Sequence, residues 1–184
     1  MGRIEDLAER YGRHIATPWQ RTVAGAQRVI ILVYDKELER TFRARQGLFE
    51  NETHGASHEW MVVDLTDAFA TWMAAQEYRD AYFESPEDLT LKLETEFTEV
   101  VADRVRVVLQ KAGENTVVGV LGIASLFGFT RFSQVLRLVE RDIKGRLVVF
   151  FPGQFENNNY RLLDARDDWN YLAVPVTMHG SENR

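Results

Sequence analysis

Residues 116–151, TVVGVLGIASLFGFTRFSQVLRLVERDIKGRLVVFF, contain the pattern that decides the fold. The segment begins and ends with short apolar runs, 116–123 and 146–151, of the kind that forms strands buried on both faces. Between these runs, apolar residues recur at three- and four-residue steps, which is the spacing of one helical face. These residues are Phe132, Val135, Leu136, Val139 and Ile143. The order strand, helix, strand predicts two parallel strands joined by a crossover helix.

The same alternation of strands and helices extends over the rest of the chain. We expect further strands at 27–34, 59–65, 160–163 and 171–177, helices at 4–15, 35–49, 65–73 and 85–112, and a polar loop at 51–57. Asp35 is expected to cap the helix after the first strand, and Pro175 predicts an edge position for the last strand. The chain is therefore expected to be one α/β domain over residues 1–184. We expect a three-layer α-β-α sandwich around a mostly parallel sheet of about five strands, with a short disordered tail from about residue 178.

The composition of the chain narrows the classes of function. Cysteine is absent, which excludes disulfides, thiolate metal sites and cysteine nucleophiles and is typical of a cytoplasmic protein. The formal net charge of −6 argues against a large non-specific nucleic-acid surface. No apolar stretch resembles a signal peptide or is long enough to cross a bilayer. We therefore expect a soluble, cytoplasmic protein with no membrane partner.

Asp35 and Ser125 are the candidate reactive side chains, because ligands of an open parallel sheet bind outside the carboxyl ends of its strands. No GxxxxGK[ST] or GxGxxG phosphate-binding motif occurs, and Gly119 and Gly122 are expected to admit a closely packed helix instead. Ser125 does not lie in a GxSxG motif, and the only downstream histidine for a catalytic triad is His179. We therefore expect no catalytic residue and no cofactor. The alternative is an enzyme that acts on a nucleotide or phosphoester through Asp35 and Ser125.

Two further groups of polar residues could carry chemistry. His54 and His58 are spaced for metal binding across one helical turn, but Gly55 and the polar neighbours favour a surface loop without a metal. Three basic residues share the solvent side of the helix before the strand at 146–151: Arg137, Arg141 and Lys144. Acidic residues interrupt this face, so the favoured interpretation is a solvated, salt-bridged surface. A nucleic-acid-binding module is the second alternative.

Aromatic residues gather after the third predicted strand. Phe127 and Phe129 are expected just beyond the carboxyl end of this strand, and Phe151 is expected at the end of the neighbouring strand. Part of this group must belong to the core, and part is expected to form an exposed apolar patch, which on a soluble protein usually marks a partner surface. Arg131 is expected to satisfy polar groups or an acidic partner at the same patch. The predicted partner-binding residues are therefore Phe127, Phe129, Arg131 and Phe151.

Two segments of this region are distinctive: residues 124–133, ASLFGFTRFS, and residues 147–153, LVVFFPG. They resemble the BrxB family of bacterial BREX phage-defence systems, which has a loop near LFPFxRxS and a strand ending in FYPG. Residues 34–35 (YD) and 170–171 (NY) are similar to further positions of that family. The sequence departs from the family pattern at three positions, with Gly128 for proline, Phe151 for tyrosine and Leu172 for arginine.

The resemblance implies a small non-catalytic component of a multiprotein complex that restricts phage. It also implies a fold like that of a P-loop protein without its nucleotide-binding motif. The implied partners are other BREX components, a large ATPase and a PglZ-like phosphatase-fold protein, and a homodimer is a further candidate. We therefore expect a non-catalytic adaptor or scaffold that acts through protein–protein interaction, without direct binding to nucleic acid.

Overall fold

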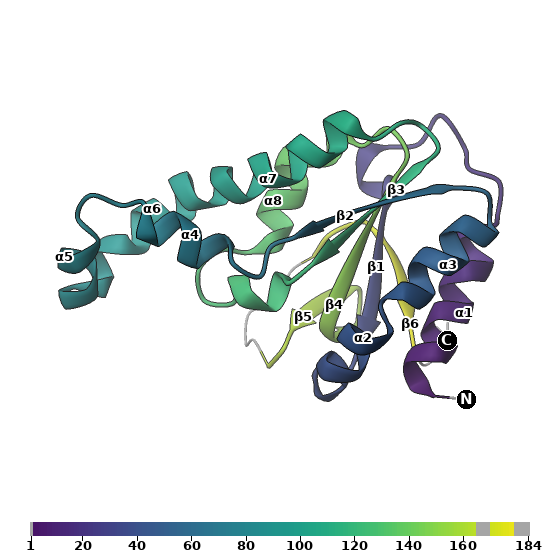
Figure 1. Ribbon diagram of the computed structural model, residues 1–184, viewed down its shortest axis with the longest axis horizontal. Helices are drawn as coiled ribbons and strands as arrows, with labels where there is room; N and C mark the ends of the chain where they lie inside the picture. Colours follow the sequence, from purple (N-terminus) through teal and green to yellow (C-terminus); the bar gives the residue numbers. More distant parts are fainter. Residues whose placement is uncertain (1, 165–169, 179–184) are drawn as a thin grey trace.

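Six strands form one sheet in the computed structural model, which describes residues 2–164 and 170–178 (Figure 1). The strands are β1 (Val29–Tyr34), β2 (Glu59–Asp64), β3 (Thr116–Leu121), β4 (Arg146–Glu156), β5 (Asn159–Leu162) and β6 (Val174–Thr177). Their order is β2-β3-β4-β1-β6, and β5 pairs with β4 outside this path. Neighbouring strands are parallel except β4 and β5, which are antiparallel. The structure confirms the α/β class, the mostly parallel sheet and the edge position of the strand that contains Pro175.

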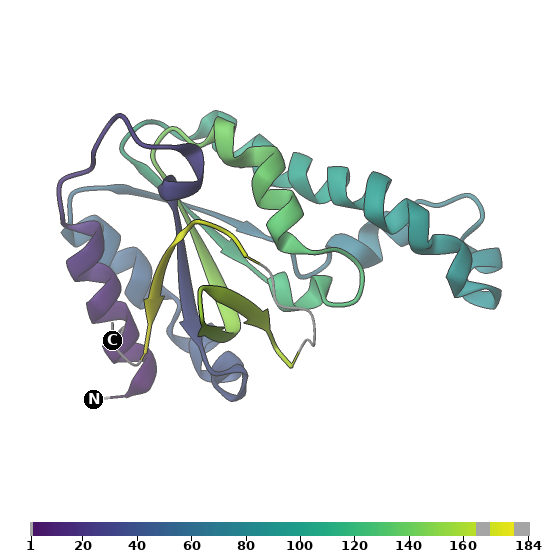
Figure 2. The same ribbon diagram turned by 180° about the vertical axis from the view of Figure 1, so that it is seen from behind.

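Helices cover both faces of the sheet, because its central strands are apolar on both faces (Figure 1, Figure 2). Ile30 and Leu32 of β1 belong to the core cluster that contains residues of α1 and α3. The alternate residues Ile31 and Val33 belong to the cluster that contains residues of α7 and α8. The α-helices are α1 (Arg3–Ile15), α2 (Glu39–Arg45), α3 (Gly47–Gly55), α4 (Ala68–Ala74), α5 (Arg79–Glu84), α6 (Thr90–Lys92), α7 (Thr98–Lys111) and α8 (Phe132–Val139). None of the described helices has the length and apolar character to cross a membrane.

Shorter helical turns connect these elements. The 3-10 turns are η1 (Gly25–Arg28), η2 (Lys36–Leu38), η3 (Pro86–Leu89), η5 (Ile123–Leu126) and η6 (Glu140–Asp142), and a π-helical turn, η4 (Leu93–Phe97), precedes α7. Together η3, α6, η4 and α7 form the long helical segment predicted at 85–112. Its first half, with α5, extends beyond the β2 edge of the sheet in both views (Figure 1, Figure 2). We call residues 76–97 the helical arm.

The prediction of a polar loop at 51–57 is wrong, because helix α3 continues to Gly55. One side of this polar helix is buried: Phe49 and Thr53 are both 0% exposed. Thr53 donates a hydrogen bond to the Phe49 carbonyl at 2.7 Å, and its oxygen lies 2.6 Å from the Tyr11 hydroxyl of α1. Packing against α1 therefore stabilises a helix that composition alone disfavours.

Gly119 allows a close contact, but its neighbour is not the helix that the sequence predicted. A Cβ atom at this position would lie 2.7 Å from two atoms of the Trp60 ring, which comes from the adjacent strand β2. The close packing at Gly119 is therefore between an aromatic side chain and the backbone of β3. The predicted tail beyond residue 178, together with His179, lies outside the described residues.

Candidate functional site

The loop after β3 carries three of the four predicted partner-binding residues at the carboxyl edge of the sheet. Gly122 leaves the strand with a φ of 80°, a left-handed conformation that glycine adopts without strain. Leu126, at the end of η5, is buried, and its carbonyl accepts hydrogen bonds from the N–H groups three and four residues later at 2.9 and 3.1 Å. This anchored turn holds Phe127 on the surface, where it is 47% exposed.

Phe129 is only partly exposed, because its ring stacks on Phe69 of α4 with the ring centroids 3.8 Å apart. Phe69 in turn contacts Phe97 edge-on, at 5.7 Å, where the helical arm joins α7. The loop is therefore packed against α4 and the base of the arm. Phe127 is accessible to a partner, whereas Phe129 supports this surface from below.

A buried threonine connects the same loop to the π-helical turn. The Thr98 hydroxyl donates to the Leu93 carbonyl at 2.9 Å, five residues earlier, and its oxygen lies 2.7 Å from the Thr130 hydroxyl. Since the Thr98 proton is used by Leu93, Thr130 is the donor in the second bond. The geometry of the loop is thus coupled to the geometry of the arm.

Replacing Thr98 by valine is expected to lower the free energy of unfolding by about 1.5 kcal/mol, because the Leu93 carbonyl and the Thr130 hydroxyl both lose a buried partner. Urea unfolding measures this change. Thr95→Val is the matched control, since the exposed Thr95 makes the same kind of bond to Leu91 at 2.8 Å and water can replace it. Equal losses in the two variants would contradict the prediction.

Arg131 and Phe151 lie in different surroundings. Arg131 is exposed at the start of α8, where its carbonyl accepts a hydrogen bond from the Gln134 N–H at 3.0 Å. Phe151 is 0% exposed and packs edge-on against Tyr160 of β5 at 5.7 Å. Its side chain belongs to the core and is not accessible to a partner. Of the four predicted partner-binding residues, Phe127 and Arg131 are therefore exposed, Phe129 is partly exposed and Phe151 is buried.

The structure does not bring Asp35 and Ser125 together. They follow β1 and β3, and β4 lies between these strands, so about 10 Å separates the two strand ends. Asp35 forms an ion pair with Arg3 of α1 and makes no side-chain cap bond, so the predicted capping role is wrong. The Ser125 N–H donates to the Gly122 carbonyl at 3.0 Å. Over residues 2–164 and 170–178, no cluster of histidine and acidic side chains is arranged to hold a metal ion.

The predicted histidine loop and basic face also differ in detail from the structure. His54 is exposed in the last turn of α3, so its predicted loop position is wrong. His58 follows that helix and is half-buried, with Nδ1 2.6 Å from Asn115 Oδ1. On the basic face, Arg137 donates to the Asn170 carbonyl at 3.2 Å, and Lys144 donates to a backbone carbonyl at 3.3 Å.

The helical arm carries exposed apolar residues that the sequence analysis did not identify. Tyr78, Phe83 and Leu91 are 65%, 65% and 71% exposed. The arm also contains seven acidic and two basic residues, so much of the negative charge of the chain is concentrated there. One feature of the sequence could have indicated this exposed face. Leu91 lies outside the row of apolar residues that faces the core in the predicted helix, so its side chain is expected on the surface. The arm and the Phe127 loop together form the candidate partner-binding surface.

The fold defines the class: the chain is an α/β protein with a mostly parallel six-stranded sheet, and it carries exposed aromatic side chains and an acidic helical arm. The model of the family "BREX protein BrxB" matches residues 61–176, which include most of β2, the arm, the Phe127 loop, strands β3 to β5 and most of β6. The chain belongs to this BrxB family of BREX phage-defence systems. Comparisons with curated proteins and with solved structures find no match.

Proposed function

We propose that the chain is a non-catalytic adaptor of a BREX phage-defence complex and binds another component through the Phe127 loop and the helical arm. The observation that carries the proposal is the exposure of four large apolar side chains, three on the arm and one on the loop that packs at its base: Tyr78, Phe83, Leu91 and Phe127. Exposed aromatic residues of this kind are typical anchors of protein interfaces. Membership of the BrxB family supports the choice of complex.

The charge of the arm indicates what kind of surface it would contact. Its excess of acidic residues favours a basic groove that also accepts aromatic side chains. The partners that we propose within the BREX system are the large ATPase and the PglZ-like phosphatase-fold protein, with a second copy of the chain as a further candidate. We also propose that the fold is a P-loop-like fold without its phosphate loop, since β1 leads into Asp35 and Glu37 where a glycine-rich loop would be needed.

Co-purification with the other proteins of the same BREX locus tests this function. We expect the tagged chain to capture the ATPase or the PglZ-like protein, and the double variant Phe127→Ala/Arg131→Glu to reduce that capture at least tenfold. Phe83→Ala/Leu91→Ala tests the arm in the same way. Loss of two central apolar anchors is worth several kcal/mol at an interface, about 2 kcal/mol or more for each hot-spot residue.

Val107→Ala is the control, because Val107 is a half-exposed apolar residue on the outer side of α7 and outside the proposed surface. Circular dichroism must show that every variant is folded. Purification of the wild-type chain without any of these proteins would contradict the adaptor function. Capture that is unchanged in both double variants would show that the proposed surface is wrong.

A further inference from the structure

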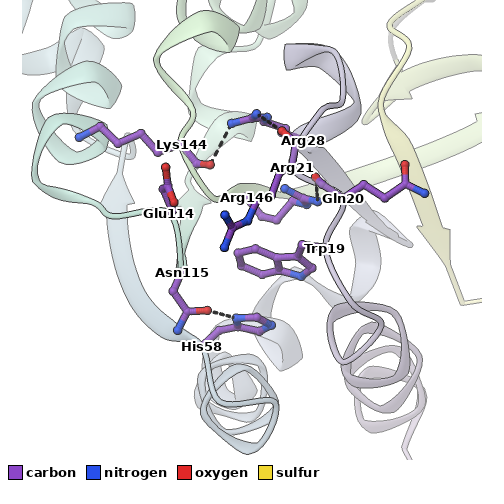
Figure 3. A pocket seen from close by; sticks show the side chains of 9 residues that line it. All are labelled: Trp19, Gln20, Arg21, Arg28, His58, Glu114, Asn115, Lys144 and Arg146. Carbon is purple, nitrogen blue, oxygen red and sulfur yellow. Dashed lines mark hydrogen bonds between the residues drawn. The ribbon is translucent and has the colours of Figure 1, made fainter.

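A pocket lies at the edge of the sheet opposite the Phe127 loop, where the parallel strands begin (Figure 3). Each of four strands supplies a residue at or just before its first position. These residues are Arg28 before β1, His58 before β2, Asn115 before β3 and Arg146 at the start of β4. Trp19, Gln20 and Arg21 also line the pocket, whose volume is about 410 Å³. A volume of this size accommodates a small ligand.

The pocket carries an excess of positive charge. Four cationic side chains line it, Arg21, Arg28, Lys144 and Arg146, against one carboxylate, Glu114. Within the described part of the chain, no ion pair joins any of these cations to an acidic side chain. The arginines of this pocket therefore differ from Arg106 of α7, whose charge is compensated by the carboxylates of Glu99, Asp103 and Asp142.

Backbone carbonyl groups fix the two central guanidinium groups without neutralising them. Arg28 donates to the carbonyl groups of Ile143, Lys144 and Arg21 at 2.8 to 2.9 Å. Arg146 donates to the carbonyl groups of Gly145 and Gln20 at 3.0 and 3.4 Å. Since each guanidinium has five N–H donors, both groups keep donors for a further acceptor.

Aromatic stacking orients Arg146. Its guanidinium carbon lies 4.7 Å from the Trp19 ring centroid, and the His58 ring stacks on Trp19 with centroids 3.8 Å apart. The His58 ring is itself fixed, with Nδ1 2.6 Å from Asn115 Oδ1 and Nε2 3.2 Å from the Ile15 carbonyl oxygen. Figure 3 shows the side chains of Arg21 and Arg146 beside the Trp19 ring. A preorganised arginine of this kind suits bidentate recognition of an oxyanion.

The neighbouring cations also repel one another. Partial burial and the charge of Arg28 lower the pKa of the Arg146 guanidinium below its usual value. An anion between these groups would remove this repulsion and stabilise the charged form.

We propose that this pocket binds the phosphate group of a small ligand, either inorganic phosphate or a phosphate monoester. The planar guanidinium groups of Arg28 and Arg146 can each donate two hydrogen bonds to the oxygens of a phosphate group. The positive charge of the pocket can also compensate the two negative charges of phosphate. The ring of Trp19 is covered by Arg146 and His58, so it offers no face on which a base could stack. Recognition therefore centres on the phosphate, and the site is independent of the proposed partner-binding surface.

Isothermal titration of the full chain at constant ionic strength, with inorganic phosphate and with AMP as separate probes, tests the proposal. We expect saturable binding of at least one probe, and tighter binding of AMP would identify a monoester as the ligand. Arg21→Gln removes a pocket charge without removing a side-chain hydrogen bond of the described structure and should weaken binding at least fivefold. The double variant Arg21→Gln/Arg146→Gln should weaken it at least fiftyfold.

Arg79→Gln is the matched control, because it removes the same charge from the exposed helical arm and should leave the dissociation constant unchanged. No binding of either probe to the wild-type chain would overturn the proposal. So would an equal loss of affinity in Arg79→Gln, which would indicate an effect of net charge alone. Binding of a single-stranded oligonucleotide, with neither phosphate nor AMP bound, would overturn it in favour of a nucleic-acid surface.

Discussion

Replacing Phe150 by alanine is expected to lower the free energy of unfolding by about 4 kcal/mol, the largest change that we predict for a single side chain. Phe150 lies in β4 and is 2% exposed. Its ring centroid is 4.6 Å from that of Phe42, 5.0 Å from that of Phe49 and 6.3 Å from that of Trp60. The ring therefore connects the centre of the sheet to α2, α3 and β2, and its removal leaves a cavity that none of these elements can fill alone.

Urea unfolding followed by circular dichroism measures this loss. Phe127→Ala is the matched control, since it deletes the same atoms from an exposed loop and should change stability by about 0.5 kcal/mol or less. If Phe150→Ala does not accumulate as folded protein, Phe150→Leu should give a smaller loss, about 1.5 kcal/mol, in the same direction. A change below that of the Phe127 control would show that the aromatic cluster does not stabilise the fold.

Gly145→Ala is expected to lower the free energy of unfolding by about 3 kcal/mol. Gly145 directly precedes β4, and a Cβ atom there would lie 2.1 Å from the carbonyl oxygen of Thr116 in β3. The colliding atom belongs to the backbone, so no side-chain rotation relieves the overlap. The two strands must separate at their first residues, which disrupts the sheet at its centre.

Gly47→Ala is the control for this substitution. Gly47 is the first residue of α3 and has no atom within 4 Å of the added Cβ, so alanine should stabilise the protein by about 0.5 kcal/mol. The two variants make the same chemical change, and their opposite signs are the test. A stabilising or neutral Gly145→Ala, measured in the same urea series, would contradict the predicted collision.

The strands were predictable because their signal is local. In β1, β3 and β4, uninterrupted apolar runs specify strands buried on both faces, and the structure has a strand at each of them. The same argument should have excluded Phe151 from the exposed residues, since neither face of such a strand is exposed. The end of α3 was not predictable in this way, because its residues are polar and its buried side packs on a segment distant in sequence, where Thr53 contacts Tyr11. The predicted end of β4 at Phe151 is also wrong, because this strand continues to Glu156, where it pairs with β5.

The candidate partner-binding surface was predictable in part, through the Phe127 loop, and the proposed phosphate pocket was not. Phe127 could be identified from a cluster of aromatic residues within one loop. The pocket instead combines residues from segments that are far apart in sequence, such as Trp19, His58 and Arg146. No spacing rule relates such residues, and only the strand order brings them to one edge. The local pattern groups His58 with His54 and Lys144 with Arg137 and Arg141, and both groups favour the interpretation of a surface exposed to solvent.

The strand order also constrains when the sheet can form during synthesis. Strand β1 is among the first elements to leave the ribosome, yet its neighbours β4 and β6 begin at residues 146 and 174. Until then Ile31 and its neighbours in β1 have no strand to pair with, and they are free to associate with apolar segments of other chains. Nascent chains are thus exposed to aggregation over most of their translation, and a chaperone that holds β1 should raise the yield of folded protein.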